Sequence, residues 1–178
     1  MNAWMRYTSA MCMLVLCALT CKAEVIPTVH NFNDMRSGGS PTLEWPNGYK
    51  EGVTPLVTYT CAGDATFGLS GGVIGISLPN SGNYVTTSPA IDYLKRIQIS
   101  RTPEYASNVN IYYSTDGSSW TLMTTGVTAS RYYIEALMPS RGDYYLKIER
   151  ASTGSGIFIK QITYYTEPCN CFELEEEE

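Results

Sequence analysis

The stretch from residue 111 to residue 120, which reads IYYSTDGSSW, constrains the fold more than any other part of this chain. A run of strand-forming residues ends at the pair Asp116 and Gly117, and Trp120 opens a second run. An Asp-Gly pair between two such runs is a strong local signal for a β-hairpin, because glycine accepts the positive φ that tight turns require. The sequence therefore predicts two antiparallel strands joined by a turn here.

Strand-like runs separated by turn-forming residues fill most of the chain, and no segment shows sustained helical periodicity. The predicted strands cover residues 25–32, 56–61, 73–78, 84–87, 94–100, 109–114, 120–124, 131–137, 143–150 and 156–165. Turns are expected between them, including residues 71–72 and the Arg-Gly-Asp triplet at 141–143. Many short strands with short turns predict an all-β fold, an antiparallel β-sandwich of jelly-roll type.

Four Tyr-Tyr pairs lie on these strands, and in the first three of them side-chain alternation along the strand assigns one ring to the core. The pattern places Tyr113, Tyr132 and Tyr144 inside. It places Tyr112, Tyr133 and Tyr145 in contact with solvent. In the last predicted strand the apolar residues change phase, which predicts a β-bulge near residues 160–161.

The first 23 residues have the pattern of a signal peptide. Residues 7–21 form an apolar run that is too short to span a bilayer, and small residues precede a cleavage point before Glu24. We expect a secreted protein, extracellular or periplasmic, with a bacterial-type signal peptide at residues 1–23. One β-sandwich domain is expected over residues 24–168, followed by a Cys-x-Cys and acidic tail over residues 169–178.

The charge of the chain argues against nucleic acid as a partner. Five of the 17 acidic residues lie in the last six positions, and residues 24–172 hold 10 basic and 12 acidic residues. A protein that neutralises phosphates needs a basic surface, which this nearly neutral body lacks. We expect the glutamate tail to stay solvated, with cation binding as the less favoured alternative.

Three cysteines follow the signal peptide, and an odd number cannot all pair within one chain. In an oxidising compartment Cys61 could form a disulfide with Cys169 or with Cys171, and the sequence does not choose between them. Unpaired thiols are the main alternative. A zinc site is less favoured, because the spacing of these cysteines and His30 does not match structural zinc sites.

The chain resembles a known class of β-sandwich. The pattern Tyr113-x-Ser-x-Asp-Gly-x-x-Trp120, the strand at 142–150 and the closing strand at 157–165 resemble discoidin or galactose-binding-like jelly-roll modules. Residues 58–61, 83–87 and 89–91 with the final strands resemble accessory modules of secreted bacterial polysaccharide-degrading proteins, including pectate lyases. The resemblance spans residues 53–166 and implies the same fold. Related closing strands often carry paired aspartates where this chain has Lys160 and Gln161, so the sequence leaves calcium binding open.

Exposed aromatic residues are the main functional clue. A flat ring on a sheet surface can stack on the apolar face of a sugar while neighbouring polar groups bind its hydroxyls. The predicted ligand-binding residues are Tyr112, Tyr133 and Tyr145 on the strands, with Trp45 and Tyr49 beside a turn. Tyrosine also favours exposed strands for stability alone, which is the competing interpretation of each.

Catalytic residues are not singled out. His30 is the only histidine, and we expect it to be structural. No pair of carboxylates stands out for glycoside hydrolysis. The sequence therefore favours a secreted, non-catalytic carbohydrate-binding or accessory module that binds a polysaccharide without a cofactor. The alternatives are a surface adhesion or protein-interaction module, alone or within a longer chain, and, less favoured, a small polysaccharide-active enzyme.

Overall fold

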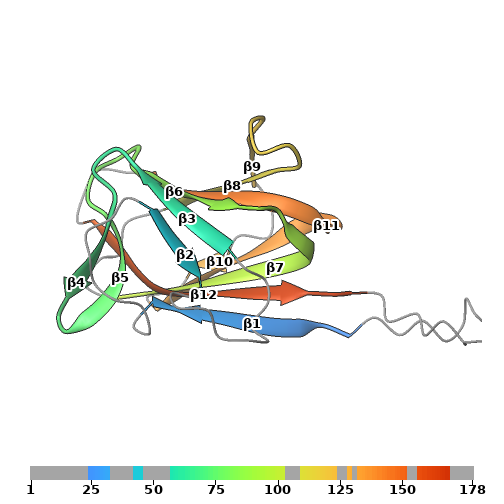
Figure 1. Cartoon of the computed structure of the whole chain (residues 1–178), viewed down its shortest axis with the longest axis horizontal. Helices are drawn as coiled ribbons and strands as arrows, with labels where there is room; N and C mark the ends of the chain where they lie inside the picture. The colour runs from blue at the N-terminus through green and yellow to red at the C-terminus, as the bar shows by residue number, and fades with distance from the viewer. Residues whose placement is uncertain are drawn as a thin grey trace, which may run out of the picture.

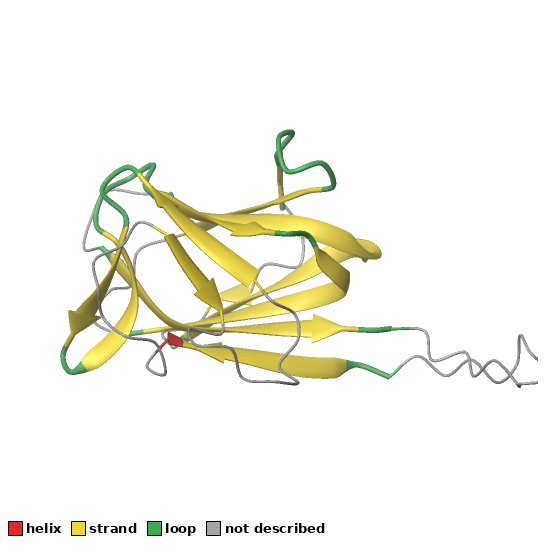
Figure 2. Cartoon of the chain, viewed as in Figure 1, coloured by secondary structure: helices red, strands yellow, loops and turns green. Residues whose placement is uncertain are grey.

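The structure is a computed structural model, and it describes residues 24–32, 42–45, 57–102, 109–123, 128–129, 132–151 and 156–168. These residues form β-strands and loops, with one residue of 3₁₀ conformation at Phe32 and no α-helix (Figure 2). None of them belongs to a helix that is long and apolar enough to cross a membrane. The strands are β1 (Ile26–Asn31), β2 (Thr42–Trp45), β3 (Val57–Ala62), β4 (Thr66–Ser70), β5 (Val73–Leu78), β6 (Tyr84–Ser88), β7 (Ile91–Arg101), β8 (Val109–Ser114), β9 (Thr121–Leu122), β10 (Thr128–Ala129), β11 (Tyr133–Arg150) and β12 (Ile157–Thr166).

The strands form two antiparallel sheets packed face to face (Figure 1). Sheet A runs β10, β11, β7, β12, β5 and β4, and β1 also pairs with β12. Sheet B runs β2, β3, β6, β11, β8 and β9. β11 belongs to both, since its first part pairs with β7 and its last part pairs with β6 and β8. The predicted antiparallel β-sandwich of jelly-roll type is confirmed.

The core lies between the sheets and follows from the alternation of side chains. In β7 the residues Ile97 and Ile99 are buried, while Gln98 between them is only half-buried. In the sheet B part of β11, Leu146 and Ile148 are also buried and belong to the core. Each such side chain contributes roughly 1.5–3 kcal/mol of transfer free energy, so the alternation fixes which face of each strand turns inward.

One polar cluster crosses the core. His30 Nδ1 forms a hydrogen bond with the Tyr59 hydroxyl at 2.5 Å, and the Tyr59 hydroxyl lies 2.9 Å from that of Tyr164. All three side chains are fully buried. Burial raises the pKa of both tyrosines. The cluster connects β1, β3 and β12, and therefore both sheets, in keeping with the structural role predicted for His30.

The prediction of a turn at residues 141–143 is wrong. The two strands predicted around it are one strand, β11, which runs from Tyr133 to Arg150. Its pairing with β7 shifts register between Leu137 and Gly142 and again between Gly142 and Tyr144. The residues that suggested a turn lie at these two irregularities, within a strand that stays extended. The bulge predicted near residues 160–161 is confirmed by a register shift between Ile159 and Gln161 in β12.

The predicted division of the tyrosine pairs holds with one exception. Tyr144 is buried, Tyr113 packs partly buried against the core, and Tyr112 and Tyr145 are half-buried on the outer face of their strands. Tyr133 is 40% exposed, as expected. Tyr132 is 60% exposed rather than buried. It precedes the first residue of β11, so strand alternation does not apply to it.

Candidate functional site

The outer face of sheet B carries a cleft of about 440 Å³. Strand register places Thr60 of β3, Thr86 of β6 and Lys147 of β11 in one row across the sheet, and this row forms part of the lining. Three aromatic side chains also line the cleft, namely Tyr84, Trp120 and Tyr145. The cleft thus combines rings with the hydroxyl groups of threonine side chains on a preformed sheet.

The loop between β8 and β9 forms one wall of the cleft. The two strands pair at Tyr112 with Leu122 and at Tyr113 with Thr121, so the predicted hairpin is confirmed, although its loop is longer than a two-residue turn. Gly117 has a φ of 74°, as expected for the glycine of this turn. A β-carbon there would lie 3.4 Å from the Tyr145 ring, so the loop rests directly on that ring.

Asp116 holds this loop in shape. Its Oδ1 accepts hydrogen bonds from the backbone N–H groups of Ser118, at 2.8 Å, and Ser119, at 2.7 Å. Ser114 Oγ donates to the same oxygen at 2.8 Å and accepts a bond from the Gly117 N–H at 2.9 Å. The bonds from Ser119 and Ser118 lower the pKa of the Asp116 carboxyl well below its usual value. The loop that presents Trp120 is therefore ordered by an ionised aspartate.

Lys147 lies among the aromatic rings of the site. Its Nζ is 4.0 Å from the centre of the Tyr112 ring, 5.4 Å from that of Tyr84 and 5.7 Å from that of Trp120. Glu149 Oε2 lies 3.8 Å from the same ammonium group. These cation–π contacts hold the charge over the sheet, and Lys147 occupies one face of the Tyr112 ring.

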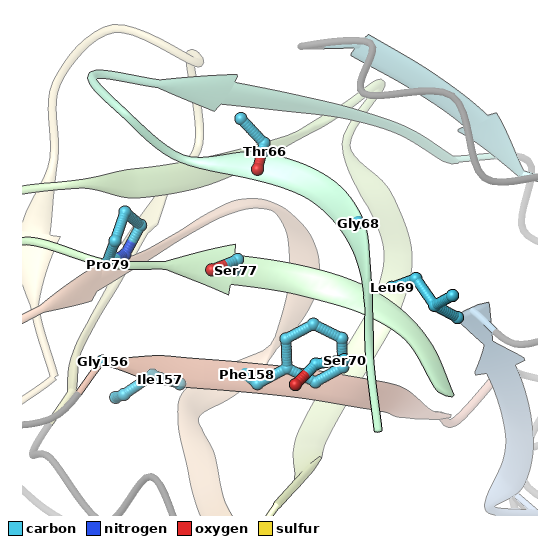
Figure 3. A pocket seen from close by; sticks show the side chains of 9 residues that line it. All are labelled: Thr66, Gly68, Leu69, Ser70, Ser77, Pro79, Gly156, Ile157 and Phe158. Atoms are coloured by element: carbon cyan, nitrogen blue, oxygen red, sulfur yellow. The ribbon is translucent and has the colours of Figure 1, made fainter. Parts of the chain in front are cut away.

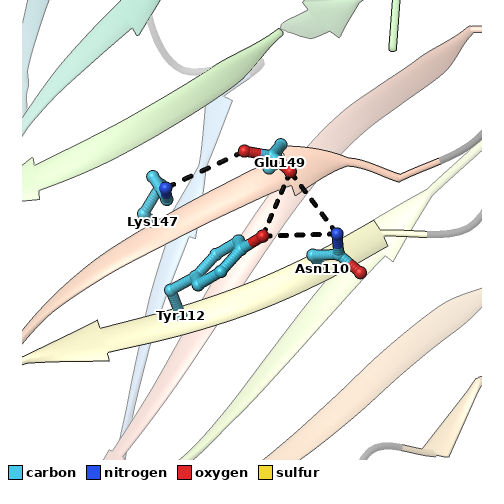
Figure 4. Close-up of polar contacts among 4 residues, drawn as sticks. All are labelled: Asn110, Tyr112, Lys147 and Glu149. Carbon is cyan, nitrogen blue, oxygen red and sulfur yellow. Dashed lines mark hydrogen bonds and ion pairs between the residues drawn. The ribbon is translucent and has the colours of Figure 1, made fainter. Parts of the chain in front are cut away.

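The hydroxyl of Tyr112 is also engaged (Figure 4). It donates a hydrogen bond to Glu149 Oε1 at 3.2 Å. Asn110 Nδ2 donates to the Tyr112 hydroxyl and to Glu149 Oε1, each at 3.4 Å. Burial, and then the charge of Glu149, raise the pKa of Tyr112. Tyr112 therefore supports Lys147 and Glu149, and less of its ring is open for stacking than the sequence suggested.

The predicted site residues do not form one surface. Tyr112 and Tyr145 lie on neighbouring strands of sheet B, but Tyr133 lies on the outer face of sheet A, where β11 pairs with β7. The three-ring platform is not assembled, because β11 passes from one sheet to the other between Tyr133 and Tyr145. Trp45 is the last residue of β2 and pairs with Val57. Tyr49 lies outside the described residues.

Sequence reasoning missed Tyr84 and Lys147 as site residues, and it used Trp120 only as the start of the second strand of the hairpin. Val85 is buried, and neighbouring residues of a strand lie on opposite faces, so alternation predicts that Tyr84 faces outward. Tyr84 and Lys147 come close together because β6 pairs with β11 in a particular register. A local sequence pattern does not reveal that register.

The reactive side chains His30 and Cys61 are both buried. Among the described residues, no group of three or more histidine, cysteine or acidic side chains could hold a metal ion. His30 is buried in the core, away from the cleft. Cys61 is buried as well, and burial raises the pKa of its thiol to about 12. Cys169 and Cys171 fall outside the described part of the chain, so the pairing of Cys61 stays a prediction.

Comparisons with known proteins give a similarity to solved structures. No family model matches the chain, and no curated protein matches it in sequence. Among solved structures, the chain is similar to a low-affinity xylan-binding module, CBM86, from the gut symbiont Roseburia intestinalis. The two share 12% sequence identity with a TM-score of 0.44, over 83% of this chain and 99% of the module. The function is therefore inferred from the cleft itself.

Proposed function

We propose that the chain is a secreted, non-catalytic carbohydrate-binding or accessory module, and that the cleft on sheet B binds a glycan. The observation that carries this proposal is the meeting of Tyr84, Trp120 and Tyr145 with threonine hydroxyls in one cleft on the outer face of a sheet. No metal or cofactor is needed for such binding.

The chemistry of a sugar ring fits this lining. The C–H groups of a pyranose form an apolar face that packs on an aromatic ring, and its hydroxyls both donate and accept hydrogen bonds. Thr60 and Thr86 offer hydroxyls on the floor, and Lys147 offers an ammonium group with three donors. Tyr145 is already packed against the loop at Gly117, so little side-chain freedom is lost when a ligand binds.

Binding is favoured over hydrolysis by the residues that line the cleft. Glycoside hydrolysis requires two carboxyl groups placed on either side of the scissile bond. The lining residues that the structure describes include no aspartate or glutamate. Glu149 lies beside the cleft, and its carboxylate is engaged by Tyr112 and Asn110. This arrangement supports a module that binds glycans without cleaving them.

A glycan array with the protein from residue 24 onward tests the proposal, followed by calorimetry with any glycan that binds. We expect Tyr145→Ala and Trp120→Ala to weaken binding by about tenfold or more, because each removes a ring from the cleft. Tyr133→Ala is the matched control, since it removes the same side chain from sheet A and should leave affinity unchanged. Thermal melting of each variant verifies that it is folded.

Two results would count against a glycan site in this cleft. One is the absence of any bound glycan on the array. The other is an equal loss of affinity in Tyr133→Ala and Tyr145→Ala, which would show that the cleft is not where the ligand lies.

A protein-interaction module is the second candidate, and a specific surface favours it. Tyr133 is 40% exposed and Leu137 is 52% exposed on the sheet A part of β11, next to the exposed Tyr132. Tyrosine is enriched in protein interfaces. Cross-linking that captures a protein partner, and that is lost in Tyr133→Ala but kept in Tyr145→Ala, would favour this function.

A further inference from the structure

Lys147 is the charged side chain in the cleft of sheet B. Among the described residues that line the cleft, it is the only one that carries a charge at neutral pH, and the others supply rings, hydroxyl groups and small side chains. Its side chain is 17% exposed, so the ammonium group is partly withdrawn from water. A ligand in the cleft therefore meets a positive charge, and the described lining presents no negative one.

The ammonium group of Lys147 has N–H donors to spare. Its Nζ lies 4.0, 5.4 and 5.7 Å from the ring centres of Tyr112, Tyr84 and Trp120, contacts that place the charge but supply no oxygen acceptor. The carboxylate oxygen paired with it, Glu149 Oε2, lies at 3.8 Å, whereas a hydrogen bond needs roughly 2.7–3.2 Å. Among the described residues, none accepts a hydrogen bond from this ammonium group.

Glu149 offsets the charge of Lys147 only in part. Its Oε1 accepts hydrogen bonds from the Tyr112 hydroxyl and from Asn110 Nδ2, which both belong to β8 (Figure 4). Glu149 is not a lining residue of the cleft. Coulomb attraction grows as the distance falls, so an anion in the cleft at hydrogen-bond distance interacts with the ammonium group more strongly than Glu149 does at 3.8 Å.

We propose that the glycan bound in the cleft is acidic, and that Lys147 binds its anionic group, a uronate carboxylate or a sulfate ester. This inference rests on the function proposed for the cleft. The oxyanion accepts the N–H donors that the protein leaves unused, and such charge-assisted hydrogen bonds are stronger than neutral ones. Partial burial strengthens the pairing further, because the effective dielectric is lower than in bulk water.

The overall charge of the chain does not favour acidic ligands. Its formal net charge is −5 at pH 7, so an acidic polymer is repelled at long range. A preference for an acidic glycan over its neutral counterpart therefore has to arise from a local positive charge, and Lys147 supplies that charge in the cleft.

The hollow beside the hairpin of β4 and β5, shown in Figure 3, provides an internal reference. The described residues that line it include no charged side chain, and its aromatic residue, Phe158, is only 4% exposed. It shares no lining residue with the cleft. We therefore expect no acidic glycan in this hollow, and the amide of Ser77 reports on it.

The test compares glycans that differ only at C6. β-1,4-linked hexasaccharides of glucose, galactose and mannose are each prepared as the neutral sugar, as the C6 carboxylate and as the C6 sulfate ester, which separates uronate from sulfate. Calorimetry gives the ratio of acidic to neutral affinity. For at least one backbone, we expect the native protein to bind an acidic form about tenfold or more tightly than the neutral form.

Two variants assign this ratio to the charge of Lys147. Lys147→Gln removes the charge, and the ratio should fall to within about threefold. Lys147→Arg keeps the charge and should keep the preference. In the native protein, the Cε signal of Lys147 should shift when the preferred acidic glycan is added, while the Ser77 amide should not.

Three results would overturn the inference. Equal affinity for neutral and acidic forms, with both lost in Tyr145→Ala, would do so and leave the proposed function standing. A preference that persists in Lys147→Gln would place the recognition of charge elsewhere. If Lys147→Gln does not fold, the absence of a shift at the native Lys147 Cε decides against the inference. Binding of none of these probes also refutes it, whereas the glycan array tests the proposed function on its own.

Discussion

Lys147 is the residue around which the candidate site is arranged. Cation–π contacts contribute about 0.5–2 kcal/mol each, whereas a partly exposed ion pair contributes about 0–1 kcal/mol. Glu149 lies 3.8 Å from the ammonium group, and the Tyr112 ring centre lies 4.0 Å from it. The rings therefore hold Lys147 in place more than the carboxylate does. Under the proposed function, we therefore expect Tyr112 to affect a glycan in the cleft mainly through the position of Lys147.

Two substitutions at Tyr112 separate its ring from its hydroxyl. Tyr112→Phe keeps the ring under Lys147 and removes the hydrogen bond to Glu149, so we expect glycan affinity to change by less than about threefold. Stability should fall by about 0.5–1.5 kcal/mol. Tyr112→Leu removes the ring, and affinity should fall by about tenfold. Calorimetry and chemical denaturation measure the two effects. Loss of binding in Tyr112→Phe would mean that the hydroxyl itself contacts the glycan.

At the scale of elements, the Asp116 side chain binds two backbone N–H groups of the loop between β8 and β9. Asp116→Ala removes the acceptor of the Ser118 and Ser119 N–H groups, so we expect these amides to exchange with solvent about tenfold faster or more. Asp116→Asn keeps an oxygen acceptor without the charge and should exchange at an intermediate rate. Hydrogen exchange followed by NMR measures both. Equal protection in all three proteins would show that strand pairing alone orders the loop.

The same loop has a defined dependence on pH. Hydrogen bonds lower the pKa of Asp116 in the folded protein below the ordinary value of 3.8. A group with a lowered pKa stabilises the fold above its unfolded value, and this contribution is lost as the pH falls toward the folded value. We expect the Asp116 carboxyl carbon to keep its carboxylate chemical shift at pH 3, while a peptide of residues 111–122 titrates near 3.8. Equal titration in peptide and protein would contradict this account.

Several elements could be predicted because their signals are local. β5 and β8 begin and end where the alternation and the flanking turns place them. The continuity of β11 could not be predicted, because Arg-Gly-Asp is typical of a turn and only pairing with β7 across two bulges keeps it extended. β4 was missed because its central Gly68 and exposed Leu69 break the pattern of a strand.

The candidate site was predictable only in part for the same reason. Alternation correctly turned Tyr112 and Tyr145 outward, but it carries no information about which strands lie side by side. Tyr133 was grouped with them, although β11 places it in the other sheet. Tyr84 reaches the site through the pairing of β6 with β11, which is a contact between distant parts of the sequence.

At the scale of the whole molecule, β11 belongs to both sheets and joins them. Its first part pairs with β7 in sheet A, and its last part pairs with β6 and β8 in sheet B. The buried cluster of His30, Tyr59 and Tyr164 connects the same sheets from another direction. Neither sheet can lose β11 without exposing the core that both share, so we expect the sandwich to unfold in a single transition.

Leu146→Ala tests this cooperativity. Leu146 is fully buried on the sheet B part of β11, opposite Tyr113 of β8, so its truncation should lower the free energy of unfolding by about 2–5 kcal/mol. If the sandwich is one unit, the slowest-exchanging amides of β7 and of β8 should lose the same free energy of exchange. Leu122→Ala is the control, because Leu122 is exposed on β9, and its effect should stay within about 0.5 kcal/mol. Loss of protection in β8 with full protection in β7 would mean that the sheets open separately, and that a ligand on sheet B stabilises sheet B alone.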